Sequence, residues 1–323
     1  MIRYRVKLSD PGAHVLDVVC EIESPHPDGQ TVSLPRWIPG SYLIRDFARH
    51  VIEISAACNG QNLAVHKTDN STWSVEPVAG PLSVRMRVYA YDLSVRGAYF
   101  DTTRAFFNGP CVFLKVHGFE NEQSEVLVER PEDERLDDFR VATAMPAVDI
   151  DGAGFGSYRA TGYDELIDHP FEISDFTHVT FDACNVPHHV AISGRHETDT
   201  AQLAKDLRRI CEQHVRFFGE PAPMDQYWFL TMAVGKGYGG LEHRASSSLL
   251  CRRDELPLSG SKMTKAYRRF LGLVSHEYFH SWNVKRMKPA VFSPYELDAA
   301  TPTEQLWIFE GITSYYDELA LLR

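Results

Sequence analysis

The sequence lacks several features that would point to a membrane or secreted protein. None of its 323 residues belongs to a run of eighteen uninterrupted apolar residues, so no transmembrane helix is predicted. The first stretch, "MIRYRVKLSDPGAHVLDVVCEIE", alternates charged and apolar residues and has no signal-peptide core. We therefore expect residues 1–23 to form strands, with no membrane association.

Cysteine is scarce and scattered. The six cysteines show no C-x-x-C spacing, which in a chain of this length predicts free thiols in a reducing compartment and not a disulfide framework. A cytoplasmic location is the corresponding expectation. The same scatter argues against a metal site with cysteine ligands.

Positive charge is also in deficit. Lys and Arg number 33 against 44 Asp and Glu, giving a net charge of −11. A nucleic-acid partner is therefore not expected, because such partners select a basic face. Mild acidity suits cationic ligands such as peptide amino termini, but many acidic proteins are merely soluble. The oligomeric state cannot be inferred from these numbers.

Strand signals dominate the first half of the chain. Short alternating runs are separated by Gly, Pro, Asn and Asp, a spacing typical of packed β-sheets. We predict an N-terminal all-β domain over residues 1–165. The runs are "HVLDVVCEIE", "HVIEISAACNG", "LSVRMRVYAYDLSV", "CVFLKVHGF" and "SEVLVER".

The second half mixes helix and strand signals. In "TDTAQLAKDLRRICEQHVRFFG", apolar residues recur at helical spacing from Leu203 to Phe218 and Gly219 is placed to end the helix, while "QYWFLTMAV" indicates a central strand. Helical patterns then continue to the end of the chain. The fold class expected is therefore α+β and multidomain, with a catalytic domain over residues 166–323 that ends partway through a helical region.

One stretch in that domain, "VSHEYFHSWNVKRMKP", runs from Val274 to Pro289 and carries two histidines four residues apart. On a helix, His276 and His280 would lie on one face about one turn, roughly 6 Å, apart and could hold one ion. Glu277 would reach a water beside that ion without binding the metal itself. The alternative is an amphipathic helix with two solvated histidines, but the apolar residues before the motif favour the metal site.

Catalytic zinc usually has about three protein ligands, so a third is required. We select Glu310 in "LWIFEGIT", because its apolar neighbours should bury the site and Gly311 should allow a close helix–helix approach. A carboxylate on an apolar face is costly unless it meets a cation. Glu304 is less suitable, because it completes a capping box that begins at Thr301 and predicts the start of this helix.

A glycine-rich stretch, "GKGYGGLEH", precedes the histidine motif. Gly239 and Gly240 could leave a strand edge open to an extended peptide, and Glu242 would then face the substrate's α-ammonium group. The alternative is a tight turn with a solvated Glu242 and a packed His243. Spacing alone does not choose between the two.

Three of these motifs together, "GGLEH", "HEYFHSWNVKR" and "WIFEGITSYY", resemble the glycyl aminopeptidase family of zinc metallopeptidases. This family belongs to the gluzincins, which have a thermolysin-like catalytic domain. The resemblance extends through "SLPRWIPGSYLIRDFARHV", "SVRGAYFDTTRAFFNG" and "YDELIDHPFEI", so it covers essentially the whole chain.

The resemblance implies that His276, His280 and Glu310 bind zinc and that Glu277 is the general base. It also implies that Glu242 binds the substrate's amino group. The implied activity is the release of N-terminal residues, with glycine and alanine favoured, from peptides that have a free N-terminus.

The resemblance also implies features that depart from this sequence or lie beyond it. His243 stands where related aminopeptidases have Asn, so the amine pocket is expected to differ. A longer helical domain and commonly a PDZ domain are implied after residue 323, together with the tyrosine that stabilises the oxyanion. We predict that Tyr315 and Tyr316 are instead aromatic core positions. A zinc endopeptidase and a non-catalytic peptide-binding scaffold remain the alternatives.

Overall fold

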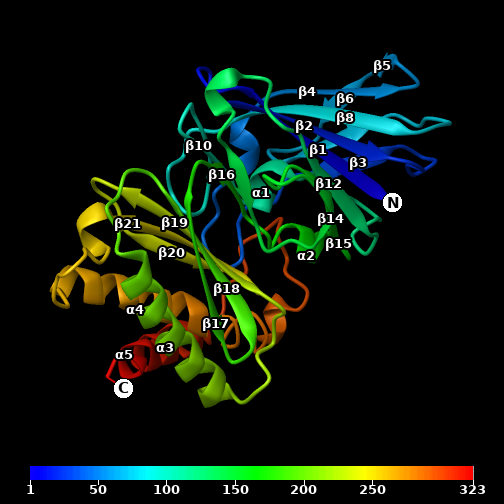
Figure 1. The fold of residues 1–323 in the computed structure, drawn as a ribbon. Helices are drawn as coiled ribbons and strands as arrows, with labels where there is room; N and C mark the ends of the chain where they lie inside the picture. Colours follow the sequence, from blue (N-terminus) through cyan, green and yellow to red (C-terminus); the bar gives the residue numbers. More distant parts are fainter. Residues whose placement is uncertain (323) are drawn as a thin grey trace. The chain divides into compact units, whose positions relative to one another are not determined.

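The computed structural model describes residues 1–322, which form two compact units. The first comprises 1–141, 145–175 and 297–300, and the second comprises 142–144, 176–296 and the described residues from 301 onward. The first unit is rich in strands, whereas the second adds three long helices to a sheet (Figure 1). The mixed α+β class is as predicted.

An eight-stranded sheet is the largest element of the first unit. Its order is β14-β15-β12-β1-β2-β8-β4-β5, and β1 pairs in parallel with β12 and antiparallel with β2. The bounds are β1 Ile2–Asp10, β2 Val15–Ile22, β4 Val51–Cys58, β5 Gln61–Leu63, β8 Leu82–Tyr89, β12 Ser124–Val128, β14 Ala147–Ile150 and β15 Gly156–Ala160.

Two four-stranded sheets accompany it, in the orders β13-β16-β10-β9 and β11-β3-β7-β6. Their strands are β3 Gln30–Ser33, β6 Val65–Lys67, β7 Thr72–Val75, β9 Ala98–Phe100, β10 Arg104–Phe107, β11 Lys115–Val116, β13 Arg140–Ala142 and β16 Phe171–Ser174. Short helices lie between strands: η1 Phe47–His50, α1 Gly109–Val112, η2 Glu134–Leu136 and α2 Tyr163–Leu166.

Alternation explains most of these strands. Ile2, Tyr4, Val6 and Leu8 of β1 point into the core while the residues between them face outward. The strand predicted over "CVFLKVHGF" is largely wrong, because this stretch begins inside α1 and contributes only the two-residue β11. Pro110 at the start of α1 explains the difference, since its fixed φ suits the first turn of a helix.

The second unit is built on a five-stranded sheet of order β17-β18-β19-β21-β20. Strands β18, β19 and β21 are mutually parallel, while β17 and β20 pair antiparallel at the two edges. The predicted central strand is confirmed as β19. The bounds are β17 Thr177–Ala183, β18 Val186–Ser193, β19 Tyr227–Val234, β20 Gly239–Glu242 and β21 Ser246–Arg252.

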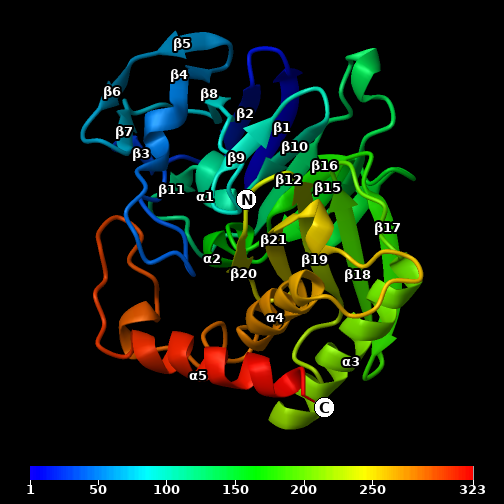
Figure 2. The ribbon, with the colours of Figure 1, turned by 90° about the vertical axis from the view of Figure 1, so that its left-hand side faces the viewer.

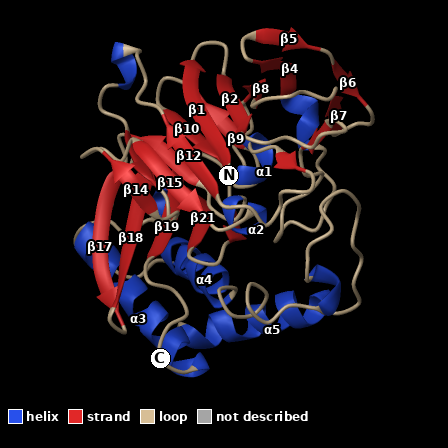
Figure 3. Cartoon of the chain, turned by 90° about the vertical axis from the view of Figure 1, so that its right-hand side faces the viewer, coloured by secondary structure: helices blue, strands red, loops and turns tan. Residues whose placement is uncertain are grey.

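Three long helices of this unit are α3 Thr200–Phe218, α4 Lys265–Phe279 and α5 Leu306–Ala320, with short turns η3 Arg253–Glu255 and η4 Ala290–Phe292. The first two share one apolar core with the sheet, and α4 contacts both α3 and α5 (Figures 2 and 3). Helix α3 ends at Gly219 as predicted, because a φ of 101° there favours glycine.

Helix α5 begins later than predicted. The Thr301 hydroxyl donates to the Glu296 carbonyl instead of accepting from a helical N–H, and the helix starts at Leu306 after an uncapped Gln305. The core prediction is also wrong for Tyr315, which is exposed, whereas Tyr316 stacks on Phe279.

Across residues 1–322, no helix has the length and apolarity needed to cross a membrane. None of the six cysteines forms a disulfide.

Candidate metal centre

Helix α4 presents the histidine motif. The Thr264 hydroxyl caps it by accepting from the Tyr267 backbone N–H at 3.0 Å. One face of the helix, including Phe270 and Val274, is buried against the sheet and α3. The helix ends at Phe279, and His280 keeps a helical backbone as its C-cap. Both histidines therefore lie on the last turn, at the edge of the packed face.

The structure brings the three predicted ligands together. The Nε2 atoms of His276 and His280 lie 3.1 Å apart, and Glu310 Oε2 lies 3.6 Å from the first and 3.9 Å from the second. Ligands about 2.0–2.1 Å from a tetrahedral zinc are about 3.3 Å from one another. The donor set and spacing fit such an ion after a shift of a few tenths of an ångström in Glu310.

Neighbouring groups fix the tautomer of both rings. His276 Nδ1 lies 2.8 Å from Asp317 Oδ2, and His280 Nδ1 lies 2.9 Å from the Asn283 carbonyl. Both partners are acceptors, so each Nδ1 carries the proton and each Nε2 is directed at the shared point. Such support by a carboxylate or carbonyl orients histidine ligands in metal sites.

The electrostatics of the site favour a cation. Burial lowers the pKa of His276, but its hydrogen bond to Asp317 and the nearby carboxylate of Glu310 outweigh burial and raise that pKa to about 10. Two bare Nε2 lone pairs would repel each other at 3.1 Å. A proton on His276 Nε2 relieves this repulsion and occupies the position that a metal ion would take.

Glu310 is less buried than predicted. Its side chain is 40% exposed, and Trp307 is exposed at 67%. Helix α5 buries one narrow stripe of Phe309, Thr313 and Asp317, and Glu310 lies beside this stripe. The expected close approach at Gly311 is also wrong, since a Cβ there would meet nothing within 4 Å.

Glu277 is held against the edge strand of the sheet. A Cβ on Gly240 would lie 2.0 Å from Glu277 Oε1 and 2.6 Å from its Cγ, so the glycine makes room for this side chain. Glu277 is itself buried. The two predicted glycines therefore have different roles. Gly240 makes room for the Glu277 carboxylate, whereas Gly239 is the first residue of the edge strand β20.

Glu242 lies at the other end of β20, opposite Ser247 of β21. It is 3% exposed, and its Oε1 has no hydrogen-bond partner among the described residues. The solvated glutamate considered as an alternative is therefore wrong. His243 is buried, and its backbone N–H donates to Ser246 to close the turn.

Glu242, Glu277 and His280 form a second group whose ligand atoms lie within 4.8 Å of one another. His280 cannot serve both groups, because Nδ1 is occupied by the Asn283 carbonyl and Nε2 points to Glu310. With a metal ion in the first group, the second is left with two buried carboxylates. An ammonium group suits that arrangement, because it is a small cation that can donate hydrogen bonds to both carboxylates.

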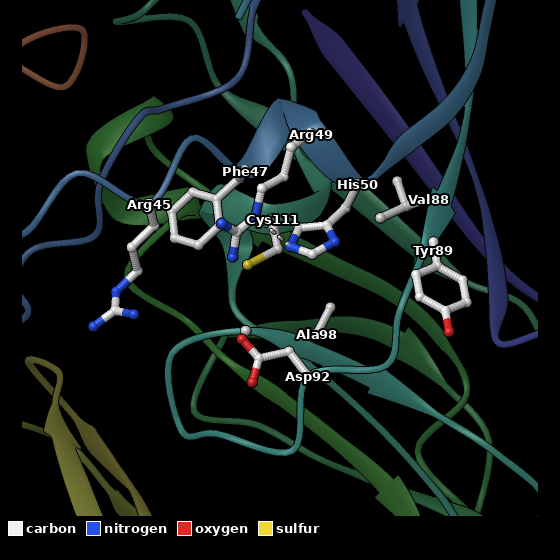
Figure 4. Close-up of a pocket in the computed structure, with 10 residues that line it drawn as sticks. Arg45, Phe47, Arg49, His50, Val88, Tyr89, Asp92, Ala98 and Cys111 are labelled. Atoms are coloured by element: carbon white, nitrogen blue, oxygen red, sulfur yellow. Dashed lines mark hydrogen bonds between the residues drawn. The ribbon is translucent and has the colours of Figure 1, made fainter.

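A separate small hollow lies in the first unit (Figure 4). The side chains around it include Arg45, His50, Asp92 and Cys111. Burial lowers the pKa of His50 and raises that of Cys111. His50, Asp92 and Cys111 are not among the groups of described residues whose ligand atoms lie within 4.8 Å of one another, so this lining does not offer a metal-ligand set.

Asp317 is the functional residue that the sequence reading missed. It follows Glu310 by two helical turns and therefore lies on the same side of α5. That spacing was the available signal. Asn283 follows the end of α4, and its backbone carbonyl accepts from His280 Nδ1.

Family models match two stretches of the chain. The model of the peptidase M61 N-terminal domain matches residues 3–175, and that of the M61 glycyl aminopeptidase matches residues 269–323. A search of curated proteins found no match.

Among solved structures, an aminopeptidase N family protein from Idiomarina loihiensis is 43% identical, with a TM-score of 0.97 over 99% of this chain. The chain spans 54% of that protein's length. Two further structures share the fold at 14% identity and 99% coverage of this chain. One is a mutant M1 zinc metallopeptidase from Deinococcus radiodurans, with a TM-score of 0.55 and 69% of its chain covered. The other is Legionella pneumophila aminopeptidase A in complex with aspartic acid, with a TM-score of 0.63 and 37% of its chain covered.

Proposed function

We propose that this chain, which belongs to the M61 glycyl aminopeptidase family, carries the zinc site of an aminopeptidase that removes N-terminal residues from peptides. The observation that carries the proposal is the convergence of His276 Nε2, His280 Nε2 and Glu310 Oε2 within 3.9 Å. These three side chains would hold the zinc. When bound, zinc supplies Lewis acidity that polarises a peptide carbonyl and makes water a better nucleophile near neutral pH.

Glu277 is the proposed general base. It is buried and kept beside His280 by the contact with Gly240, so its carboxylate has little freedom to leave the site. In this position it takes a proton from the attacking water and returns it to the departing amine. A glutamate beside the ion but outside its ligands is what this role requires.

Glu242 is the proposed partner of the substrate's α-ammonium group. A buried carboxylate oxygen without a partner is costly, and a cation would remove that cost. A free amino terminus supplies this cation, whereas the interior of a peptide does not. This supports an aminopeptidase over an endopeptidase. The preference for glycine and alanine is carried over from the family as part of the proposal.

The test combines metal analysis with paired substrates. We expect one zinc per chain by elemental analysis, and cleavage of glycyl and alanyl amides but not of their N-acetylated forms. Glu277→Gln should lower kcat by at least about a thousandfold while zinc is retained, because proton transfer and water activation are both lost. Glu242→Gln should instead raise KM for the free amines.

Glu304→Gln is the matched control, since it removes an exposed carboxylate shortly before α5 and should leave kcat and KM unchanged. Equal cleavage of acetylated substrates would indicate an endopeptidase. Undiminished activity in Glu277→Gln would contradict the catalytic role, and the absence of bound zinc would contradict the metal site itself.

A further inference from the structure

A buried chain of hydrogen bonds runs through all three long helices of the second unit and ends at a proposed zinc ligand. His214 Nε2 of α3 lies 2.8 Å from the Ser275 hydroxyl of α4. That hydroxyl donates at 3.0 Å to the backbone carbonyl of Asp317 in α5. The carboxylate of Asp317 then accepts from His276 Nδ1 at 2.8 Å.

The direction of each bond follows from the number of protons available. Ser275 has one hydroxyl proton and gives it to Asp317, so it must accept from His214, whose Nε2 therefore carries a proton. Burial lowers the pKa of His214 to about 3, so the ring is neutral near pH 7. His214 and Ser275 are 2% and 0% exposed, and neither is a candidate to touch substrate or metal.

This chain is a buried polar attachment of α5 to α4, beside the stacking of Tyr316 on Phe279 and an exposed ion pair between Arg268 and Glu318. A second polar attachment is made by Asn283, just after the end of α4, whose amide donates to the Ile308 carbonyl and to the Thr313 hydroxyl. Glu310 lies between these two attachments, at Ile308 on one side and Asp317 on the other. The position of its carboxylate along α4 is therefore set by both.

We infer that Ser275 and His214 are positioning residues of the metal centre, which hold Asp317 against His276 and thereby keep Glu310 within reach of both histidines. The inference rests on the proposed function, because it requires that these side chains bind zinc. Ser275 acts on the backbone of Asp317, so the aspartate carboxylate stays free to accept from His276. The N–H of His214 donates to the Ser275 oxygen, so the hydroxyl proton is left to point toward α5.

The test uses zinc affinity, measured by competition with a chromogenic chelator, and the visible spectrum of the cobalt-substituted protein. Ser275→Ala should weaken zinc binding about tenfold, the lower end of the range for residues that support metal ligands. It should also change the cobalt d–d bands, because the geometry of Glu310 relaxes. Ser248→Ala is the control: Ser248 is equally buried, its hydroxyl has no partner among the residues described, and both readouts should be unchanged.

Substitutions at His214 separate positioning from general stability. A glutamine side-chain amide can donate from nearly the same place as imidazole Nε2, so His214→Gln should keep wild-type zinc affinity. His214→Leu fills the space without a donor and should reproduce the loss seen in Ser275→Ala. If Ser275→Ala and His214→Leu lower the melting temperature but leave zinc affinity and the cobalt spectrum unchanged, the residues are structural and the inference is wrong. If the unaltered protein binds no zinc, it is the proposed function that fails.

Discussion

The two helices that carry the proposed ligands are both fifteen residues long but are held in different ways. Helix α4 buries a broad face that includes Tyr267, Phe270, Val274 and Tyr278, and a threonine caps its start. Helix α5 is the more apolar of the two in sequence, yet it buries little beyond Phe309, Thr313 and Asp317 and has no side-chain cap.

This difference divides the metal centre into a rigid part and an adjustable part. The histidines of α4 are fixed by core packing, which survives loss of any one polar contact. Glu310 depends on a helix held by hydrogen bonds from Ser275, His276 and Asn283. We therefore expect displacement of Glu277 on α4 to lower kcat while zinc stays bound. Removal of zinc should instead loosen α5.

After the loss of the base itself in Glu277→Gln, the largest effect is expected from Gly240→Ala. Because a Cβ there would overlap Glu277 from Oε1 to Cγ, the whole carboxylate must move away from its place on α4. Displacing a catalytic group by about 1 Å costs roughly a hundredfold in rate, so kcat should fall about a hundredfold with zinc retained. Steady-state kinetics and elemental analysis measure both quantities.

Gly272→Ala provides the comparison for this change. It adds the same methyl group within α4, where the nearest atom would be Leu321 Cδ1 at an ordinary 3.8 Å, and kcat should be unaffected. Should Gly240→Ala keep full activity, the contact with Glu277 does not hold the base, and the rigid half of the comparison is wrong.

The sequence predicted the rigid half better than the adjustable one. His276, Glu277 and His280 lie within one strongly patterned helix, so their mutual placement follows from helical spacing alone. The burial of Glu310 was predicted from its apolar neighbours, but Trp307 faces outward because only one narrow stripe of α5 packs. When most residues of a helix are apolar, as in α5, their pattern does not specify which side packs against the core.

Sequence motifs also do not predict contacts between segments that are distant in sequence. The role of Gly240 depends on how β20 passes α4, and the chain from His214 to Asp317 joins three helices. The start of α5 was misplaced because the capping box at Thr301 is a local signal, and the hydroxyl found another acceptor. Tertiary contacts decided the first two cases, and a contact within the preceding loop decided the third.

An effect of intermediate size is expected when zinc is removed. A ligand that binds only the folded site stabilises the segments that carry its ligands against local unfolding. For zinc, the less firmly packed of these segments is α5, which carries Glu310. Chelation should therefore raise amide hydrogen exchange in 306–320 about tenfold, while exchange in 265–279 stays unchanged because core packing persists. Helix α3 serves as an internal reference. Equal acceleration of α4 and α5 would show that both halves depend on the metal.

The smallest effect concerns how α4 is tied to the sheet. His188 of β18 donates Nδ1–H to the Val186 carbonyl and accepts from the Tyr278 hydroxyl at 2.9 Å, and burial lowers its pKa from 6.5 to about 4. Because the native pKa lies below the unfolded one, this neutral ring stabilises the fold fully above pH 6.5 and progressively less as the pH falls toward 4. Between pH 7 and 5.5, His188 should account for about 1 kcal/mol of the loss in the free energy of unfolding. His188→Gln can make both bonds without titrating, so its loss should be smaller by about this amount, while buried histidines such as His214 contribute equally in both proteins. Denaturant unfolding at the two pH values measures it, and the same pH dependence in both proteins would mean that His188 does not couple α4 to the sheet in this way.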